Sequence, residues 1–373
     1  MQYLAFSEMC RVSCDIDDAT NRRILAVAED SLSGFYERPF LAIAEACGLD
    51  EGTVMERLRC MLSSHTLRYL RQTLPSTALT RGCLIAWRVE ESQLTQAFEW
   101  LRVHDPFTGH IVIRRAVDAA APGADYRLWT TLKVPAQGGD VGTHCRILAQ
   151  HIGAQDYACM PVVGMFSLSV GHVRRAGLAA DALQAQEPGM QRPPKPQLRE
   201  EDWPVLLSFR KPLQESEICS TPWVARAEAL GLSAEAFCAA AHRLVQQGAL
   251  GRFAAVLNHV HPRVSVGSGA LLMWAVPPGM EEAAGAACGR HVSMTHCYWR
   301  SGAERFGGVQ IMGVVHAASR EGALERKAAI DAYLSRKGIP VLHSNVFFTE
   351  RAEIRPSEID PHAWQNWINE KCE

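Results

Sequence analysis

The stretch "MTHCYWR", residues 294–300, combines residue types that can do chemistry. Read as a β-strand, it places Met294, His296, Tyr298 and Arg300 on one face and the three residues between them on the other. Histidine can transfer protons near neutral pH, and arginine binds carboxylates through paired N–H donors. An imidazole, a phenol and a guanidinium in a row would make an unusual core, so these residues are candidates for a functional site.

A second stretch, "TGHIVIRR" at residues 108–115, repeats part of this spacing. Arg114 follows His110 by four residues, as Arg300 follows His296, so each pair shares one strand face. At a rise of about 3.3 Å per residue, each histidine and its arginine lie about 13 Å apart. One group could therefore act at a reacting centre while the other holds a peripheral group. A lone histidine on a half-buried strand is more often structural, and that alternative stays open for both.

Composition excludes several classes of protein. The chain has 373 residues, 47% hydrophobic and 21% charged, with a formal net charge of −2, which gives no global attraction to nucleic acid or membrane. No apolar run is long enough to span a bilayer, and the first residues lack the pattern of a signal peptide. The twelve cysteines are scattered without a CxxC pair, which is typical of reduced, cytosolic usage. We expect a cytoplasmic protein without a membrane association.

The most informative feature is an internal repeat. Residues 40–70 and 223–253 both read as a helix, a Gly-Leu turn, an Asp or Ser cap and a second amphipathic helix, which is a helix-turn-helix pattern. In each copy a strand ending in Trp follows, then a helix, two strands, a second helix and a last strand. The predicted strands are 81–90, 108–115, 126–135 and 160–175 in the first copy, and 268–277, 294–300, 309–317 and 339–355 in the second.

This order predicts an α+β fold of two tandem repeats, each a helix-turn-helix followed by a ferredoxin-like (βαββαβ) domain. The two domains would form a pseudo-dimer with their sheets packed together. A segment rich in Pro and charged residues separates the copies and reads as a linker. The predicted domains are 1–75 (helix-turn-helix), 76–183 (ferredoxin-like), 184–204 (linker), 205–262 (helix-turn-helix) and 263–373 (ferredoxin-like).

A helix-turn-helix also raises the possibility of DNA binding. The recognition helix of the first copy, "EGTVMERLRCML", carries two arginines beside two glutamates, and that of the second, "AEAFCAAAHRLVQQ", is rich in alanine and has one arginine and one histidine. Reading DNA needs basic and amide side chains on this helix. We therefore expect these helices to pack rather than to bind DNA.

Together, "RFAAVLNHVHPRVSVGSGALLMWAVP", which follows the second helix-turn-helix, and "THCYWR" resemble the siroheme decarboxylases of the Nir and Ahb type. These enzymes are relatives of the Lrp/AsnC regulators, and the resemblance covers both copies. It implies non-oxidative removal of acetate carboxyl groups from siroheme to give 12,18-didecarboxysiroheme, for heme d1 or alternative heme biosynthesis. It implies no cofactor or metal beyond the iron tetrapyrrole substrate, and a homologous subunit or homodimer as a partner.

The resemblance and the spacing together select the site residues. The predicted catalytic residues are His296 and His110, as proton donors to the ring or to the nascent methylene group. The predicted substrate-binding residues are Arg300, Arg114, Tyr298, Tyr126, His259 and His316.

The chain also departs from the family pattern. Arg127 replaces an Asn that commonly follows the tyrosine at 126, and the first copy has no counterpart of His259. The two copies therefore cannot form equivalent pockets. Two other readings stay open: an Lrp/AsnC-type regulator that senses a small molecule, and a non-catalytic tetrapyrrole-binding partner subunit.

Overall fold

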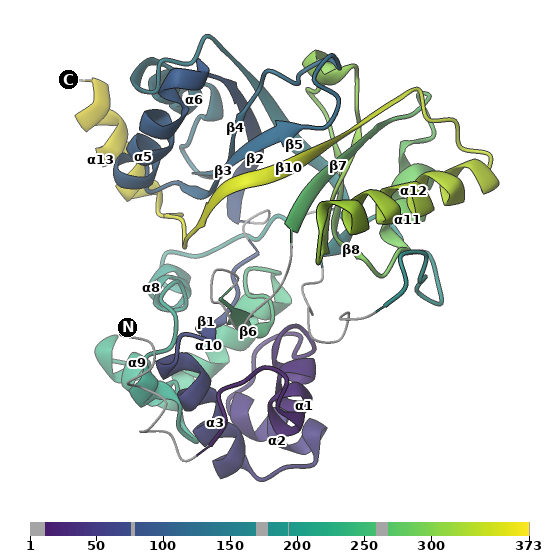
Figure 1. Ribbon diagram of the computed structural model, residues 1–373. Helices are drawn as coiled ribbons and strands as arrows, with labels where there is room; N and C mark the ends of the chain where they lie inside the picture. Colours follow the sequence, from purple (N-terminus) through teal and green to yellow (C-terminus); the bar gives the residue numbers. More distant parts are fainter. Residues whose placement is uncertain (1–11, 76–78, 169–177, 193, 259–267, 373) are drawn as a thin grey trace. The chain divides into compact units, whose positions relative to one another are not determined.

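The computed structural model describes residues 12–75, 79–168, 178–192, 194–258 and 268–372 (Figure 1). These residues form two compact units. The helical unit contains residues 12–75 and 194–258, and the barrel unit contains the remaining described residues. Each unit therefore draws on both halves of the sequence.

The helical unit contains two helix-turn-helix segments. In the first, Gly48 takes the left-handed conformation (φ 63°) after α2, and the Asp50 side chain caps α3 by accepting a hydrogen bond from the Thr53 N–H (2.7 Å). In the second, Gly231 (φ 69°) and the Ser233 cap do the same before α10. The elements are α1(Ala19–Ala28), α2(Pro39–Cys47), α3(Glu51–Ser63), β1(Leu67–Gln72), α8(Asp202–Ser208), η2(Glu215–Glu217), α9(Val224–Ala229), α10(Ala234–Gln246) and β6(Phe253–Leu257). Strands β1 and β6 pair antiparallel and join the two segments.

The arginines of α3 are held by contacts inside the helical unit. Arg57 forms an ion pair with Asp18 (2.8 Å), the residue that caps α1, and Arg59 donates a hydrogen bond to the Ile218 carbonyl. In α10, Arg243 lies 3.6 Å from the buried Asp202. The basic side chains of both second helices thus take part in packing contacts.

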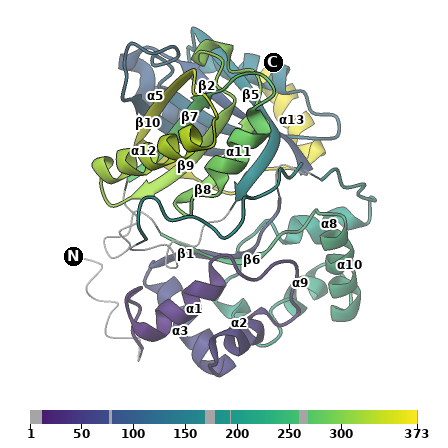
Figure 2. The ribbon, with the colours of Figure 1, turned by 90° about the vertical axis from the view of Figure 1, so that its right-hand side faces the viewer.

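The barrel unit is a closed eight-stranded barrel with the strand order β10-β3-β4-β2-β5-β8-β9-β7 (Figures 1 and 2). Its elements in the first half are β2(Thr80–Arg88), η1(Glu91–Gln93), α5(Leu94–His104), β3(Thr108–Ala116), β4(Leu128–Pro135), α6(Val141–His151) and β5(Asp156–Leu168). Those in the second half are β7(Ser268–Ala275), α11(Glu281–Gly289), β8(Met294–Arg300), η3(Glu304–Phe306), β9(Ile311–Ala317), α12(Arg320–Arg336), β10(His343–Ile354) and α13(Pro361–Cys372). The sheets of the two halves were expected to pack together. They join at their edges, where β5 pairs with β8 and β10 pairs with β3.

Helices cover the outside of the barrel. Alternate residues of β2, β3 and β4, such as Trp87, pack with α5, α6 and α13. Alternate residues of β7, β8 and β9, such as Cys297, pack with α11 and α12. The other residues of these strands point inward, where Trp129 and Met160 of the first half share one core with Met312 and Phe347 of the second. The two halves are thus joined by a common interior.

A β-bulge precedes the histidine on both β3 and β8. The register shifts between Thr108 and His110 on β3, and between Met294 and His296 on β8. The prediction that Met294 shares a face with His296 was therefore wrong. The extra residue, Thr295, turns Met294 outward into the apolar cluster that contains Cys297, while His296 points inward.

Residues 178–192 lie against the barrel rather than apart from it. Gln191 and Met165 of β5 exchange backbone hydrogen bonds (2.8 Å each), and the Gln184 N–H donates to the Arg290 carbonyl. A Cβ atom on Gly164 would lie 2.5 Å from the Met190 sulfur, so the approach of this segment requires glycine there. We name residues 178–192 the strap.

Acid should weaken the barrel unit through His291, which lies buried beneath the strap. Burial lowers the pKa of His291 from 6.5 to about 4, with Arg336 and Arg290 adding to the effect and Asp181 opposing it. The unfolded chain then binds more protons between pH 6.5 and 4, so stability is complete above pH 6.5 and falls as the pH drops towards 4. We expect a loss of about 2 kcal/mol at pH 5.

Thermal unfolding at pH 5 and pH 8 measures this effect. The variant His291→Phe, which cannot titrate, should show a smaller decrease in the Tm of the barrel unit than the wild-type protein. Equal decreases in both proteins would contradict the assignment to His291.

No helix among the described residues is both long and apolar enough to cross a membrane.

Candidate functional site

The inward faces of β3, β8 and β9 carry most of the predicted site residues. On β3, His110 and Arg114 share the inward side with Val112, which belongs to the interior core. On β8, His296, Tyr298 and Arg300 alternate with Cys297, which faces the helices. On β9, His316 lies four residues after Met312 and therefore points inward as Met312 does. The strands β3 and β8 are four places apart in the closed strand order, so the histidines and arginines of the two halves line opposite walls of one barrel interior.

Arg114 is a half-buried cation without a carboxylate partner among the described residues. Its Nη1 donates a hydrogen bond to the hydroxyl of Thr349 on β10 (3.0 Å), and its buried Nε has no acceptor. Burial lowers the pKa of the Arg114 guanidinium to about 10, so it remains charged at neutral pH. A buried cation without a counter-ion is costly unless a ligand supplies the negative charge.

Arg300, in the other half, also lacks a carboxylate partner among the described residues. It is 8% exposed, and its Nη1 donates to the Met160 carbonyl (2.7 Å), while its Nε has no acceptor among the described residues. Its guanidinium lies 4.8 Å from the centre of the Tyr298 ring, a cation–π contact. Burial lowers the pKa of Arg300, and no carboxylate in the described part of the chain forms an ion pair with it.

His296 lies beside Tyr298 on the same face. The two ring centroids are 6.2 Å apart, with an angle of 29° between the rings, and the His296 Nδ1 lies 3.1 Å from the Thr295 hydroxyl. The side chains are both half-buried. The order imidazole, phenol, guanidinium that the sequence predicted along residues 296–300 is thus present on one inward face.

A row of side chains joins Arg114 to His316 across the junction of the halves. Thr349 pairs with Arg114 in the register of β10 and β3, and Gly269 pairs with His316 in the register of β7 and β9. A Cβ on Gly269 would lie 3.5 Å from the His316 ring and 3.8 Å from the Thr349 hydroxyl. We name these four residues the Arg114 row. The sequence analysis did not select Thr349, because nothing in the pattern shows which strands pair at the junction.

Tyr126 lies away from the other predicted residues. It precedes β4, packs on Phe306 (ring centroids 5.2 Å apart), and donates a hydrogen bond to the Asp156 carboxylate (2.6 Å). Burial, followed by the hydrogen bond to Asp156, raises the pKa of Tyr126 to about 12. Asp156 begins β5, whereas His296 pairs with Leu168 at its far end. His259 lies outside the described residues.

The sequence analysis also missed Lys133. It alternates with Leu132 and Val134, which face the helices, and therefore points into the barrel. The signal was present in "LWTTLKVP", where Lys133 is the one charged residue and lies two positions after Thr131.

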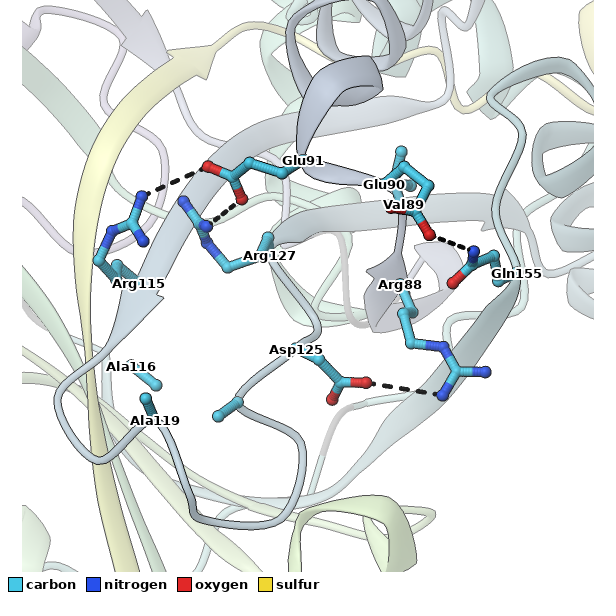
Figure 3. Close-up of a pocket in the computed structure, with 11 residues that line it drawn as sticks. Arg88, Val89, Glu90, Glu91, Arg115, Ala116, Ala119, Asp125, Arg127 and Gln155 are labelled. Atoms are coloured by element: carbon cyan, nitrogen blue, oxygen red, sulfur yellow. Dashed lines mark hydrogen bonds and ion pairs between the residues drawn. The ribbon is translucent and has the colours of Figure 1, made fainter.

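A pocket of about 380 Å³ opens at the other end of the first half (Figure 3). Its arginines are already neutralised: Arg88 by Asp125 (3.5 Å) and Arg127 by Glu91, which also contacts Arg115. None of the predicted site residues lines it. Because these arginines already have carboxylate partners, this pocket is less suited to an anionic ligand than the surroundings of Arg114 and Arg300.

In the described part of the chain, no group of His, Cys, Asp and Glu side chains has the arrangement of a metal site. The predicted site residues on β3, β8 and β9 are histidines, arginines and a tyrosine, and none of them is a carboxylate. This donor set suits a ligand that brings several carboxylates.

Two known proteins are similar to this chain over most of its length. A siroheme decarboxylase of Hydrogenobacter thermophilus is 24% identical over 332 residues, which cover 83% of this chain and 90% of that protein. The siroheme decarboxylase NirDL subunit of Paracoccus pantotrophus is 23% identical over 324 residues, covering 85% and 91%. This chain is a relative of the siroheme decarboxylases. No family model matches the sequence.

Solved siroheme decarboxylase structures have the same fold. The crystal structure of NirDL covers 94% of this chain and 97% of its own, with a TM-score of 0.67 at 20% identity. A second NirDL structure, in complex with an iron-uroporphyrin III analogue, gives a TM-score of 0.66 at 19% identity, covering 95% and 98%. The relationship to siroheme decarboxylases therefore extends over almost the whole chain, both units included.

Proposed function

We propose that this protein is a siroheme decarboxylase that converts siroheme to 12,18-didecarboxysiroheme, for heme d1 or alternative heme biosynthesis. Two proteins that are similar to this chain over most of their length are named siroheme decarboxylases, and one of the similar structures is a complex with an iron-uroporphyrin III analogue. Both siroheme and uroporphyrin are planar tetrapyrroles bearing many carboxylates.

The observation that carries the proposal is the pair of inward guanidinium groups without counter-ions. Arg114 and Arg300 occupy matching positions on β3 and β8, each four residues after a histidine. Peripheral carboxylates of the tetrapyrrole would supply the missing charge through bidentate hydrogen bonds. His296 and Tyr298 would then lie beside the ring or one of its acetate groups.

The reaction needs one proton for each carboxyl group lost. The bond between the acetate methylene and its carboxylate breaks, carbon dioxide leaves, and the electron pair passes into the protonated tetrapyrrole ring. A proton then reaches the methylene carbon and converts the acetate into a methyl group, while the ring releases the proton it had taken up, so that one proton is consumed in total. We assign His296, with His110 as its counterpart, as the proton donor. No electron acceptor other than the substrate ring is required, so the reaction needs no further cofactor.

The same proposal includes a duplicated architecture. In each half of the barrel the second, third, first and fourth strands lie in that order, which is the order of a ferredoxin-like sheet. Matching bulges, histidines and arginines on β3 and β8 support two repeats, each with its own helix-turn-helix. The domain boundaries predicted from sequence would then describe the repeats, while the compact units group like elements from both.

The regulator reading is weaker because the arginines of α3 are already engaged by Asp18 and the Ile218 carbonyl. A non-catalytic tetrapyrrole-binding subunit, working with a homologous partner or as a homodimer, remains the second candidate. It is favoured by the difference between the halves, since Tyr298 has the apolar Val112 as its counterpart on β3.

Anaerobic titration with siroheme separates these readings. We expect saturable changes in the Soret band and release of carbon dioxide into the headspace. Binding without carbon dioxide release would favour the partner subunit. Absence of binding, together with DNA retention that weakens steeply with salt, would favour the regulator.

A further inference from the structure

The barrel contains a second row of residues that matches the Arg114 row. On β8, Arg300 pairs with Val162 of β5, as Arg114 of β3 pairs with Thr349 of β10. On the next strands, Gly82 of β2 pairs with Lys133 of β4, as Gly269 of β7 pairs with His316 of β9. We name Arg300, Val162, Gly82 and Lys133 the Arg300 row. Lys133 is thus the counterpart of His316.

Both rows have a glycine inside a strand, although no described neighbour requires one there. Among the described residues, a Cβ on Gly82 would approach only the Thr80 hydroxyl (3.8 Å), and a Cβ on Gly269 would make ordinary contacts with the His316 ring. Neither glycine has a positive φ. Glycine in a strand interior lowers stability, so a pair of glycines at matching inward positions indicates that another group approaches the backbone there.

The side chain opposite Gly82 is a lysine. Lys133 is half-buried and points into the barrel, and its ammonium lies 3.3 Å from where a Cβ of Gly109 would stand. Gly109 is the extra residue of the bulge that turns His110 inward. The lysine therefore lies in the part of the barrel that holds His110, one strand away from it.

We propose that Lys133 binds a peripheral carboxylate of the tetrapyrrole, and that Gly82 gives the edge of the macrocycle room beside it. This inference rests on the proposed function and extends it. The two rows then have different tasks. The Arg300 row ends in a lysine, whose amino group anchors the substrate, whereas the Arg114 row ends in a histidine, the residue type best suited to exchange protons near neutral pH.

Titration of the full-length protein with iron uroporphyrin III tests the assignment. Lys133→Gln should raise the Kd about tenfold to a hundredfold, because a charge-assisted hydrogen bond is lost, and Lys133→Arg should restore most of the affinity. Gly82→Ala should weaken binding measurably and Gly82→Leu at least as much as Lys133→Gln, because each side chain fills space that the edge of the macrocycle needs. In turnover with siroheme, Lys133→Gln should raise KM much more than it lowers kcat.

Two comparisons separate this role from a structural one. Lys337→Gln removes an exposed lysine of α12's C-terminal cap, paired with Glu187, and should leave the Kd unchanged. The effect of Lys133→Gln should shrink with protoheme, which carries fewer carboxylates. If the wild-type protein binds iron uroporphyrin but Lys133→Gln and Gly82→Leu bind it equally well, this inference is overturned and the proposed function stands. If the wild-type protein binds no tetrapyrrole, both are overturned.

Discussion

Replacing His296 with alanine should slow carbon dioxide release by about 10²–10⁴-fold while siroheme still binds. The imidazole lies on the inward face of β8 beside Tyr298, and in our account it delivers the proton that completes the methyl group. Binding depends instead on the cations Arg114 and Arg300. Single-turnover measurement of carbon dioxide, with saturating protein, separates the chemical step from affinity.

Two further variants show whether the loss of rate is specific to His296. His362→Ala removes an exposed histidine of α13 and should have wild-type rates. His110→Ala should slow the loss of a carboxyl group only if the first half also donates protons, so it shows whether one histidine or both act. Unchanged rates in His296→Ala would remove this residue from the mechanism.

Replacing Arg114 with methionine should weaken tetrapyrrole binding strongly without destabilising the protein. Among the described residues, its guanidinium has only the neutral Thr349 hydroxyl as a partner and its Nε has no acceptor, so the free protein carries the cost of a poorly solvated cation. We expect an unchanged or higher Tm and a Kd for iron uroporphyrin raised about a hundredfold, since a buried charge pair with the ligand is lost.

The neighbouring residue provides a matched control. Arg115 lies on the same strand but is 55% exposed and pairs with Glu350 (2.5 Å) and Glu91. Arg115→Met removes the same charge and should leave the Kd within about twofold, because exposed ion pairs contribute little. A large loss of stability in Arg114→Met, or similar affinities in both variants, would show that Arg114 is structural.

Sequence patterns predicted most of the local elements in this protein. The turn glycines and capping residues placed both helix-turn-helix segments, and alternation placed β8 at residues 294–300 as observed. Alternation failed at Met294, because a β-bulge shifts the phase by one residue and leaves no signal in the sequence.

Long-range pairing was the other limit. The junctions β5–β8 and β10–β3 decide that Thr349 contacts Arg114, and no local pattern encodes them. The strap was read as the start of a linker because of its proline and charge content. Its packing depends on a specific fit between Met190 and Gly164 that composition does not report. Tyr126 remains a prediction from resemblance, and its hydrogen bond to Asp156 places it at the start of β5, away from His296.

The most direct test of the account is anaerobic incubation of the pure protein with siroheme in D₂O, followed by mass spectrometry of the extracted pigment. We predict the loss of one carbon dioxide for each converted acetate, with one deuterium gained at each new methyl group, and neither change in His296→Ala. An unchanged pigment mass after incubation with the wild-type protein, despite tight binding, would contradict the assignment of this chain as the decarboxylase.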